Sequence, residues 1–332
     1  MTKHLRRITV VLFAVVTAAL TACSGPAQTP SADSGLTKLT IGLTYQPDVQ
    51  FAPIYVAAQQ HFFEQAGLDV MIRHHGAAES LFGALQTGAE DVVFAGGDEM
   101  LQARSQGVDV VNIATVYQQY PVALLVPQGS PITDVAGLKG HSVGLPGEYG
   151  ENWFALLLLL RQAGLTPAEV NVVSIGYTQQ TALMGGQVDA VVGFTNNDAV
   201  RFQRASFPVR AIGLEGLVGA GLGVSASLLA SSTPTLQAMW GAIAQAMSVC
   251  LENPGQALAD AAVYVPGLDQ PDNRTVAEAT LQATTPLYGD PAGFGRQDAT
   301  TWAGMAQFMD DAGLLAAPVE ATDAYTTAVV GN

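Results

Sequence analysis

The sequence contains few cysteines and few basic residues for its length. Only two of the 332 residues are cysteine, so a fold held together by several disulfide bonds is excluded. Lysine and arginine together number 13, against 28 aspartate and glutamate residues, and the formal net charge is -15 at pH 7. Because nucleic acids and anionic membrane surfaces attract positively charged proteins, neither is expected to bind the surface of this chain.

Motifs that mark common enzyme classes are absent as well. There is no P-loop GxxxxGK[ST], no GxSxG elbow, no HExxH and no pair of cysteines for zinc. Residues 219–223, GAGLG, lack the full GxGxxG spacing of a dinucleotide turn. His74 and His75 are adjacent on an expected strand and point to opposite faces, so they cannot easily share one metal ion. We therefore expect no catalytic residue, no cofactor and no metal.

The first residues resemble a secretory leader. Basic residues precede an apolar run from Ile8 to Leu20, which is shorter than the roughly 20 residues that a membrane-spanning helix needs. Residues 20–23, LTAC, resemble the lipobox of bacterial lipoproteins; an ordinary signal peptide is the alternative. We expect residues 1–22 to be a signal peptide, and residues 23–35 to be a flexible tether that begins at a lipidated Cys23.

A pattern that occurs twice predicts the fold of the remaining chain. Residues 84–99 and residues 177–198, aligned at a shift of 98 positions, contain the same order of features: an Ala-Leu pair, a glycine (Gly88, Gly186), an aspartate, an apolar run and a polar loop. A short apolar run after a glycine-containing turn indicates a strand buried on both faces of a sheet. Ligands of open α/β sheets lie beyond the carboxyl ends of the strands, where these loops fall. Two lobes and a cleft are expected.

Several stretches of the mature chain resemble the NMT1/THI5-like substrate-binding proteins of ABC importers, a group that includes SsuA-like and ThiY-like proteins. The stretches are P…YVA…FFEQAGLDV from residue 53, GALQTGAEDVVFAG at 83–96, VAGLKGHSVGLPG at 135–147 and GQVDAVVGFTNND at 186–198. The resemblance implies a type II periplasmic-binding-protein fold, in which two α/β lobes enclose a ligand cleft and are joined by two crossing hinge segments.

The resemblance also sets the expected lobes and partners. The crossing segments are expected at 120–127 and 217–227, so that lobe one is 36–120 plus 221–332 and lobe two is 121–220. The helical C-terminal part is expected to pack on lobe one. The chain is then a solute receptor and not an enzyme. We expect a monomer that is lipid-anchored on the extracytoplasmic face of the cell membrane and serves an ABC permease and its ATPase.

Aromatic and amide side chains are concentrated in the six loops expected at the cleft. Aromatic faces can stack on a planar ring, and amides supply donors and acceptors for the edge of that ring. The alternative is that they are ordinary loop residues. The predicted ligand-binding residues are Tyr45, Gln46, Asp48, Gln50, Gly97, Asp98, Tyr117, Gln118, Glu148, Tyr149, Tyr177, Gln179, Phe194, Asn196 and Asn197.

The charge of these loops indicates the class of ligand. They carry four acids, including Asp198, and no lysine or arginine, which opposes an anion. We therefore expect a small neutral or cationic heteroaromatic nutrient, and the family resemblance implies a thiamine pyrimidine precursor or riboflavin. The alternatives are a sulfonate- or nitrate-type receptor of the same fold, a secreted enzyme with Asp48 or Glu148 as general base, and a sensory or adhesive lipoprotein.

The lipobox gives a first testable prediction. Cys23→Ser should leave the protein either uncleaved or released from the membrane, because serine offers no thiol for lipidation. Cell fractionation with mass spectrometry of the N-terminus measures both effects, and Ser24→Ala is the control, since it leaves the cysteine in place. Normal processing of Cys23→Ser with retention in the membrane would contradict the prediction.

Overall fold

The structure is a computed structural model that describes residues 35–76 and 79–331. The expected signal peptide and Cys23, the expected site of lipidation, lie outside these described residues. Among the described residues, none of the helices combines the length and the apolar character that crossing a membrane would require.

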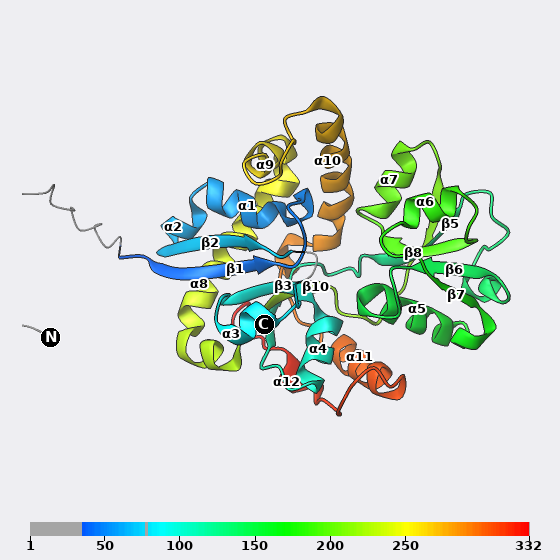
Figure 1. Ribbon diagram of the computed structural model, residues 1–332. Coiled ribbons are helices and arrows are strands. Elements are labelled where there is room, and N and C mark those ends of the chain that lie inside the picture. The colour runs from blue at the N-terminus through cyan, green and yellow to red at the C-terminus, as the bar shows by residue number, and fades with distance from the viewer. Residues whose placement is uncertain (1–34, 77–78, 332) are drawn as a thin grey trace, which may run out of the picture. The chain divides into compact units, whose positions relative to one another are not determined.

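Five strands form the first sheet, in the order β2-β1-β3-β10-β4 (Figure 1). They are β1 (Thr37–Leu43), β2 (Leu68–His74), β3 (Val92–Gly96), β4 (Val111–Thr115) and β10 (Ala220–Val224). β1 pairs with β2 and β3 in parallel, whereas β10 lies antiparallel between β3 and β4. This mixed sheet is the core of the first lobe.

Five further strands form the second sheet, in the order β7-β6-β8-β5-β9. They are β5 (Val122–Pro127), β6 (Ser142–Leu145), β7 (Asn171–Ser174), β8 (Ala190–Phe194) and β9 (Val209–Ile212). β6 is parallel to β7 and β8, and β5 is antiparallel to β8 and β9. The two-lobed α/β fold expected from the sequence is confirmed.

Helices cover both faces of each sheet. In chain order they are α1 (Ala52–Gln59), α2 (Phe62–Gln65), α3 (Gly83–Thr87), α4 (Gly97–Ser105), α5 (Gly150–Gln162), α6 (Gln179–Met184), α7 (Asp198–Arg204), α8 (Ala226–Glu252), α9 (Pro254–Ala261), α10 (Pro271–Thr284), α11 (Ala299–Asp311) and α12 (Ala321–Ala324). Short 3-10 turns are η1 (Val49–Phe51), η2 (Val135–Leu138), η3 (Pro167–Glu169), η4 (Thr285–Tyr288) and η5 (Pro291–Gly293).

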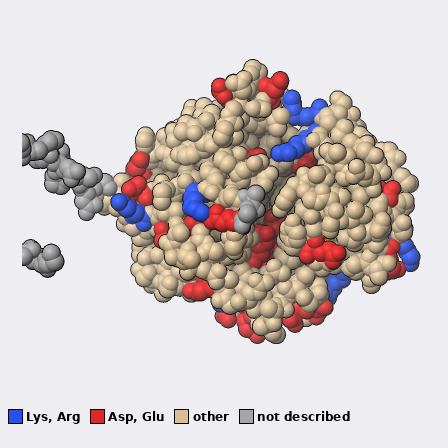
Figure 2. All heavy atoms as spheres, viewed as in Figure 1, with Lys and Arg blue, Asp and Glu red and all other residues tan. Residues whose placement is uncertain are grey.

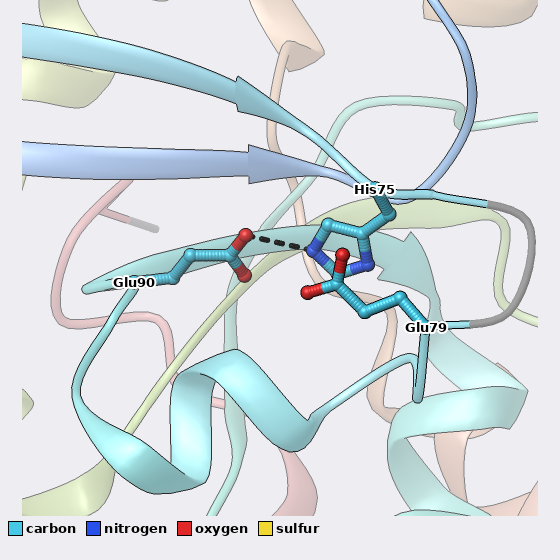
Figure 3. Close-up of side chains that lie close together, drawn as sticks. All are labelled: His75, Glu79 and Glu90. Carbon is cyan, nitrogen blue, oxygen red and sulfur yellow. Dashed lines mark hydrogen bonds and ion pairs between the residues drawn. The ribbon is translucent and has the colours of Figure 1, made fainter.

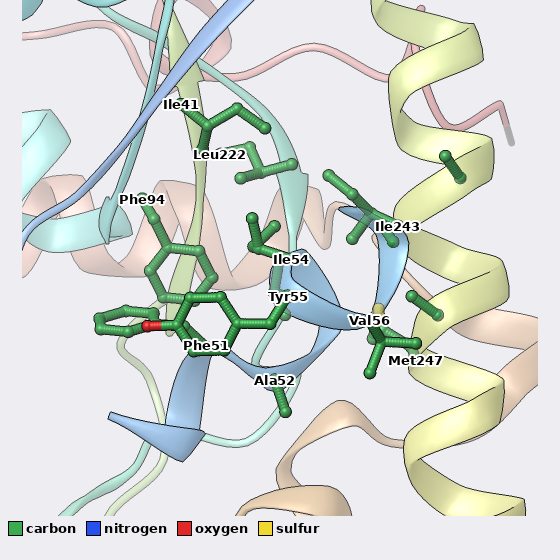
Figure 4. Packing of buried hydrophobic residues seen from close by; sticks show 14 of the residues in the cluster. Ile41, Phe51, Ala52, Ile54, Tyr55, Val56, Phe94, Leu222, Ile243 and Met247 are labelled. Atoms are coloured by element: carbon green, nitrogen blue, oxygen red, sulfur yellow. The ribbon is translucent and has the colours of Figure 1, made fainter. Parts of the chain in front are cut away.

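The alternation of side chains along a strand explains why both faces must be covered. Val92 and Phe94 of β3 belong to the apolar cluster beneath α1 and α8, whereas Val93 and Ala95 belong to the cluster beneath α3 and α4. Figure 4 shows Val56 of α1 on the side of α8, near Met247, whereas Ile54 lies on the other side, toward Leu222 of β10. The strands therefore read as continuous apolar runs, because neither face is exposed to water.

The repeated sequence pattern forms the same unit in both lobes. α3, β3 and α4 make up one copy, and α6, β8 and α7 make up the other. Gly88 is the C-cap of α3 with φ of 73°, and Gly186 follows α6 with φ of 66°. Because a left-handed backbone is strained for residues with a Cβ, glycine is required at both turns.

The chain crosses between the sheets earlier than the sequence indicated. The segment 120–127 was expected to cross, but β5 pairs with both β8 and β9 inside the second sheet. β10, within the expected crossing 217–227, likewise belongs to the first sheet. The links are therefore 116–121 and 213–219, because a buried apolar strand must pair its backbone N–H and C=O groups. The lobe boundaries at 36–120 plus 221–332 and at 121–220 remain a proposal.

The C-terminal helices contact both lobes and not only the first. α8 and α9 pack on α1, as expected. The N-terminal end of α11 is tied to β4, since Trp302 Nε1 donates to Gln297 Oε1 (2.9 Å), which also accepts from Thr115 Oγ1 (2.9 Å). On α5 of the second lobe, Arg161 pairs with Asp311 of α11 (2.8 Å). The sequence did not predict this bridge, because its partners are 150 residues apart.

The bridge can be tested by truncating its central side chain. Trp302 is fully buried and stacks on Tyr325, with ring centroids 5.3 Å apart. Trp302→Ala should lower the free energy of unfolding by about 3–5 kcal/mol through the cavity that it leaves. The control Trp302→Phe keeps most of the volume and should cost less. Urea denaturation measures both, and an unchanged midpoint for Trp302→Ala would show that α11 contributes little to stability.

Candidate ligand-binding site

A cavity of about 260 Å³ lies where loops at the carboxyl ends of strands from both sheets meet. Thr44 and Gly96 line it from the first lobe, and Pro146 and Phe194 line it from the second. An adjoining cavity of about 930 Å³ shares seven lining residues with it, among them Tyr45. Figure 2 shows acidic side chains gathered in the groove between the two lobes. The cleft expected from the sequence is therefore present as two adjoining cavities.

Eight of the fifteen predicted binding residues line the smaller cavity. They are Tyr45, Gln50, Tyr117, Tyr149, Tyr177, Gln179, Phe194 and Asn197. Gln46 lines only the larger cavity. The remaining six line neither of these two cavities: Asp48, Gly97, Asp98, Gln118, Glu148 and Asn196.

Four of these six have a structural role that the sequence does not reveal. Asp48 caps η1 through Oδ1, which accepts from the Gln50 amide (3.0 Å). Gln118 donates to the Thr115 carbonyl (2.6 Å). Gly97 is buried, and a Cβ there would collide with Val218. Asn196 is fully buried and donates to Thr284 Oγ1 of α10 (3.0 Å), so it connects the lobes and is not an exposed loop residue.

Aromatic rings form the inner wall and the rim of the smaller cavity. On the inner wall, Phe94 makes edge-to-face contacts with Phe51 (5.3 Å between centroids) and Tyr117 (5.8 Å), so packing fixes the orientation of its ring. At the rim, Tyr149 and Tyr177 from the second lobe are 57% and 78% exposed. Such exposed rings can stack on a planar ligand and exclude water from it. The rim was predicted from the sequence, whereas Phe51 and Phe94 were not. Phe94 lies in the buried apolar run of β3, and Phe51 lies in η1, where it is buried.

Three carboxyl groups converge beside the cavity from the first turns of two helices. Asp98 and Glu99 begin α4, and Glu151 lies in the first turn of α5. The Glu99 carboxylate accepts from the Gly96 amide (3.1 Å), and Asp98 Oδ2 accepts from the Tyr120 hydroxyl (2.6 Å). Glu151 Oε1 is buried and has no hydrogen-bond partner among the described residues. Helix N-termini favour carboxylates, which accounts for this placement.

Close approach of these carboxyls requires a glycine. A Cβ at Gly96 would lie 2.5 Å from Asp98 Oδ1 and 2.8 Å from Glu151 Oε1, so any other residue there would displace these two carboxyl groups. Burial raises the pKa of Asp98 to about 6 and, together with the Asp98 charge, the pKa of Glu99 to about 8. Burial and the two neighbouring charges also raise the pKa of Glu151. These three residues, called the carboxyl cluster, are Asp98, Glu99 and Glu151. Near neutral pH the carboxyl cluster retains protons and can therefore both accept and donate hydrogen bonds.

One cation faces the cavity, contrary to the sequence-based argument. The six loops contain no lysine or arginine, but Arg201 of α7 lines the smaller cavity three residues after the last loop ends. Burial raises the pKa of Asp198, and the nearby Arg201 charge counteracts that rise. A helix that follows a cleft loop brings its first turn to the cleft. Inspecting those turns would have found Arg201, Glu99 and Glu151.

Known proteins resemble this chain over most of its length. A family model described as NMT1/THI5 like matches residues 48–257. The riboflavin-binding protein RibY of Chloroflexus aurantiacus is 30% identical over 331 residues, which cover 94% of each chain. A formylaminopyrimidine-binding protein of Halalkalibacterium halodurans is 24% identical over 95% of this chain and 98% of its own. The periplasmic aliphatic sulphonate binding protein SsuA of Escherichia coli has a TM-score of 0.71 at 19% identity, covering 86% of this chain and 91% of its own.

The carboxyl cluster predicts how stability depends on pH. Because the folded state raises these pKa values, it binds more protons than the unfolded chain, and stability should fall as pH rises from about 4.5 toward about 8. Glu151→Gln removes one of the charges and should flatten this dependence, with a gain on the order of 1 kcal/mol at pH 8. Urea denaturation at about pH 5 and at about pH 8 measures this pH dependence of the free energy of unfolding.

Glu148→Gln is the matched control for that experiment. Glu148 is exposed in the loop just before α5, so its neutralisation should leave the pH dependence of unfolding unchanged. If Glu151→Gln and wild type lose the same stability between the two pH values, the cluster does not hold the additional protons.

Proposed function

We propose that this chain, which belongs to the NMT1/THI5-like family, is the extracytoplasmic solute-binding protein of an ABC importer. Family membership supports the proposal, as do two relatives named as binding proteins that match nearly the whole chain. A cavity lined from both lobes supports it physically, since a ligand held there contacts both lobes at once. Hinge closure around a ligand is the usual motion of periplasmic binding proteins.

The ligand that we propose is a planar heteroaromatic nutrient that is neutral or cationic, either riboflavin or a pyrimidine precursor of thiamine. The observation that carries this proposal is the rim of Tyr45, Tyr149 and Tyr177, which places ring faces from both lobes around one cavity. The Glu99 and Glu151 carboxyls in the same cavity can pair with the donors and acceptors of a heterocyclic edge. The names of the two relatives agree with this class of ligand.

The two cavities separate the two candidate ligands by size. A single pyrimidine ring fits within about 260 Å³, whereas a three-ring flavin with its polyol chain must extend into the adjoining cavity of about 930 Å³. Tyr45, Tyr149 and Tyr177 line both cavities, so a flavin can pass between them. We favour riboflavin, because both cavities are then used.

Arg201 is the specific observation that favours the alternative ligand, a sulfonate or another anion. A guanidinium binds sulfonates and phosphates well, but it also donates to neutral carbonyl oxygens. Glu99, Glu151 and Asp198 line the same cavity, and burial raises the pKa of each of these carboxyl groups. Protonated carboxyls can donate and accept hydrogen bonds with a neutral ligand, whereas any that ionise repel an anion in a partly dry site. We therefore propose that Arg201 donates to a carbonyl group of a neutral ligand.

The remaining roles follow from this function. We propose a lipid anchor at Cys23 that holds the protein on the extracytoplasmic face of the membrane, near an ABC permease and its ATPase. We also propose that the chain is a monomer. We propose further that it is not an enzyme, and the binding-protein names of the two relatives support this second point. A secreted enzyme with Asp48 as base fits less well, because Asp48 caps η1 and lines neither cavity.

Thermal shift measurements test the class of ligand. Riboflavin or a thiamine pyrimidine should raise the melting temperature, since a ligand at about 100 times its Kd adds roughly 2.7 kcal/mol of stability. Taurine, alkanesulfonates and flavin mononucleotide should not. A shift with sulfonates alone would contradict the proposed ligand and would assign Arg201 to an anion.

Side-chain variants test whether the cavity is the binding site. Tyr177→Ala should reduce the shift, yet leave the melting temperature of the ligand-free protein nearly unchanged, because the ring is 78% exposed. Val263→Ala is the control, since Val263 is also exposed and lines neither cavity. A full ligand shift in Tyr177→Ala would place the site elsewhere.

A further inference from the structure

A second group of polar side chains lies at the carboxyl end of β2, apart from the smaller cavity. His75 directly follows β2, Glu90 lies just before β3 and after the turn at Gly88, and Glu79 lies between His75 and Glu90 along the chain. Figure 3 shows the Glu90 carboxylate directed at the His75 ring and the Glu79 carboxylate beside that ring. One ligand atom from each of the three lies within 4.8 Å of the others. These three residues are called the His75 cluster.

The His75 cluster carries more negative charge than its one arginine neutralises. Arg73 pairs with both Glu79 and Glu90. With a neutral imidazole, two carboxylates and one guanidinium leave a single negative charge. The Glu90 side chain is 0% exposed and that of His75 is 3% exposed. Leaving a net charge in such a place costs free energy unless another positive charge is bound.

Two buried polar atoms of the cluster also lack partners. His75 Nε2 lies 2.7 Å from Glu90 Oε1. Neither His75 Nδ1 nor Glu90 Oε2 has a hydrogen-bond partner among residues 35–76 and 79–331. In the tautomer that donates Nε2–H to Glu90, Nδ1 presents a lone pair. A bound cation would satisfy lone pairs and charge together, whereas a proton on Nδ1 would leave a buried donor without an acceptor.

Space around Glu90 is kept free by the neighbouring strand. A Cβ at Gly42 of β1 would collide with all three atoms of the Glu90 carboxyl group. His75 and Glu79 line the larger cavity, so an ion can reach the cluster from that cavity. The cluster is thus both preformed and accessible.

We propose that the His75 cluster is a binding site for one zinc-like divalent ion. One imidazole and two carboxylates form a mixed nitrogen and oxygen ligand set that suits zinc, whereas calcium and magnesium prefer oxygen ligands alone. Three protein ligands leave the fourth tetrahedral position open toward the cavity. Arg73 and the ion compete for the same two carboxylates, so the guanidinium weakens metal binding and turns outward when zinc is bound.

Zinc titration of untagged, chelator-treated protein tests the proposal. Isothermal titration calorimetry with zinc alone should show one ion per chain, and magnesium should not bind. Glu79→Gln should weaken zinc binding by about tenfold or more, the scale seen when groups supporting a metal are removed. Because the Glu79 side chain is 25% exposed and Gln has the same shape, this variant should fold. His75→Ala should abolish binding.

Two further variants separate the proposal from its alternatives. His61→Ala is the matched control, because His61 also pairs with a glutamate, Glu64, but at an exposed position outside both cavities. Its zinc affinity should equal that of wild type, and a loss as large as that of Glu79→Gln would show that surface histidines bind the ion. Arg73→Gln should bind zinc more tightly. If only Arg73→Gln binds zinc, the guanidinium permanently holds the position, and the proposal is wrong.

Discussion

Burial of the central strands on both faces is the constraint on which the rest of this structure depends. The central strands β3 and β10, and also β4 at the edge of the sheet, are buried at every position, so helices must lie above and below the first sheet. The helices α4, α5 and α7 each begin just beyond the strands β3, β6 and β8, and the connecting loops therefore lie at the carboxyl ends of those strands. Where the two edges face each other, the loops and the first turns of α4, α5 and α7 enclose the cavity. The ligand site follows from the way in which the core is covered.

The electrostatic character of the site follows from the same arrangement. Helix N-termini of both lobes are directed at the cleft, and they favour the carboxyl groups of Asp98, Glu99 and Glu151. Burial opposes their ionisation, so the cluster retains protons. The folded protein is therefore expected to become less stable as pH rises. Arg201 places a positive charge in the same cavity. A ligand in this cavity therefore meets hydrogen-bonding groups of both kinds, which suits the edge of a heterocycle better than a simple anion.

Part of the site could be predicted because loop composition is a local property. Tyr45, Tyr149 and Tyr177 follow strands, and exposed rings in such loops indicate binding. Asn196 and Gln118 are the same kinds of residue in the same loops, yet their hydrogen bonds are made to Thr284 and to the Thr115 carbonyl. Whether an amide faces a ligand or another helix depends on elements far away in the sequence.

The sequence by itself determined the two α/β lobes, their repeated helix–strand–helix unit and the glycines that end the helices. These features depend on periodicity and backbone angles, which neighbouring residues specify. Only the tertiary structure decided where the chain crosses between the sheets, that α11 bridges the lobes, and that Glu151 meets Asp98 or Glu79 meets Glu90. The physical reason is distance along the chain. Contacts of this kind join residues that only the assembled sheets bring together, and their energies depend on burial and charge that no local pattern contains.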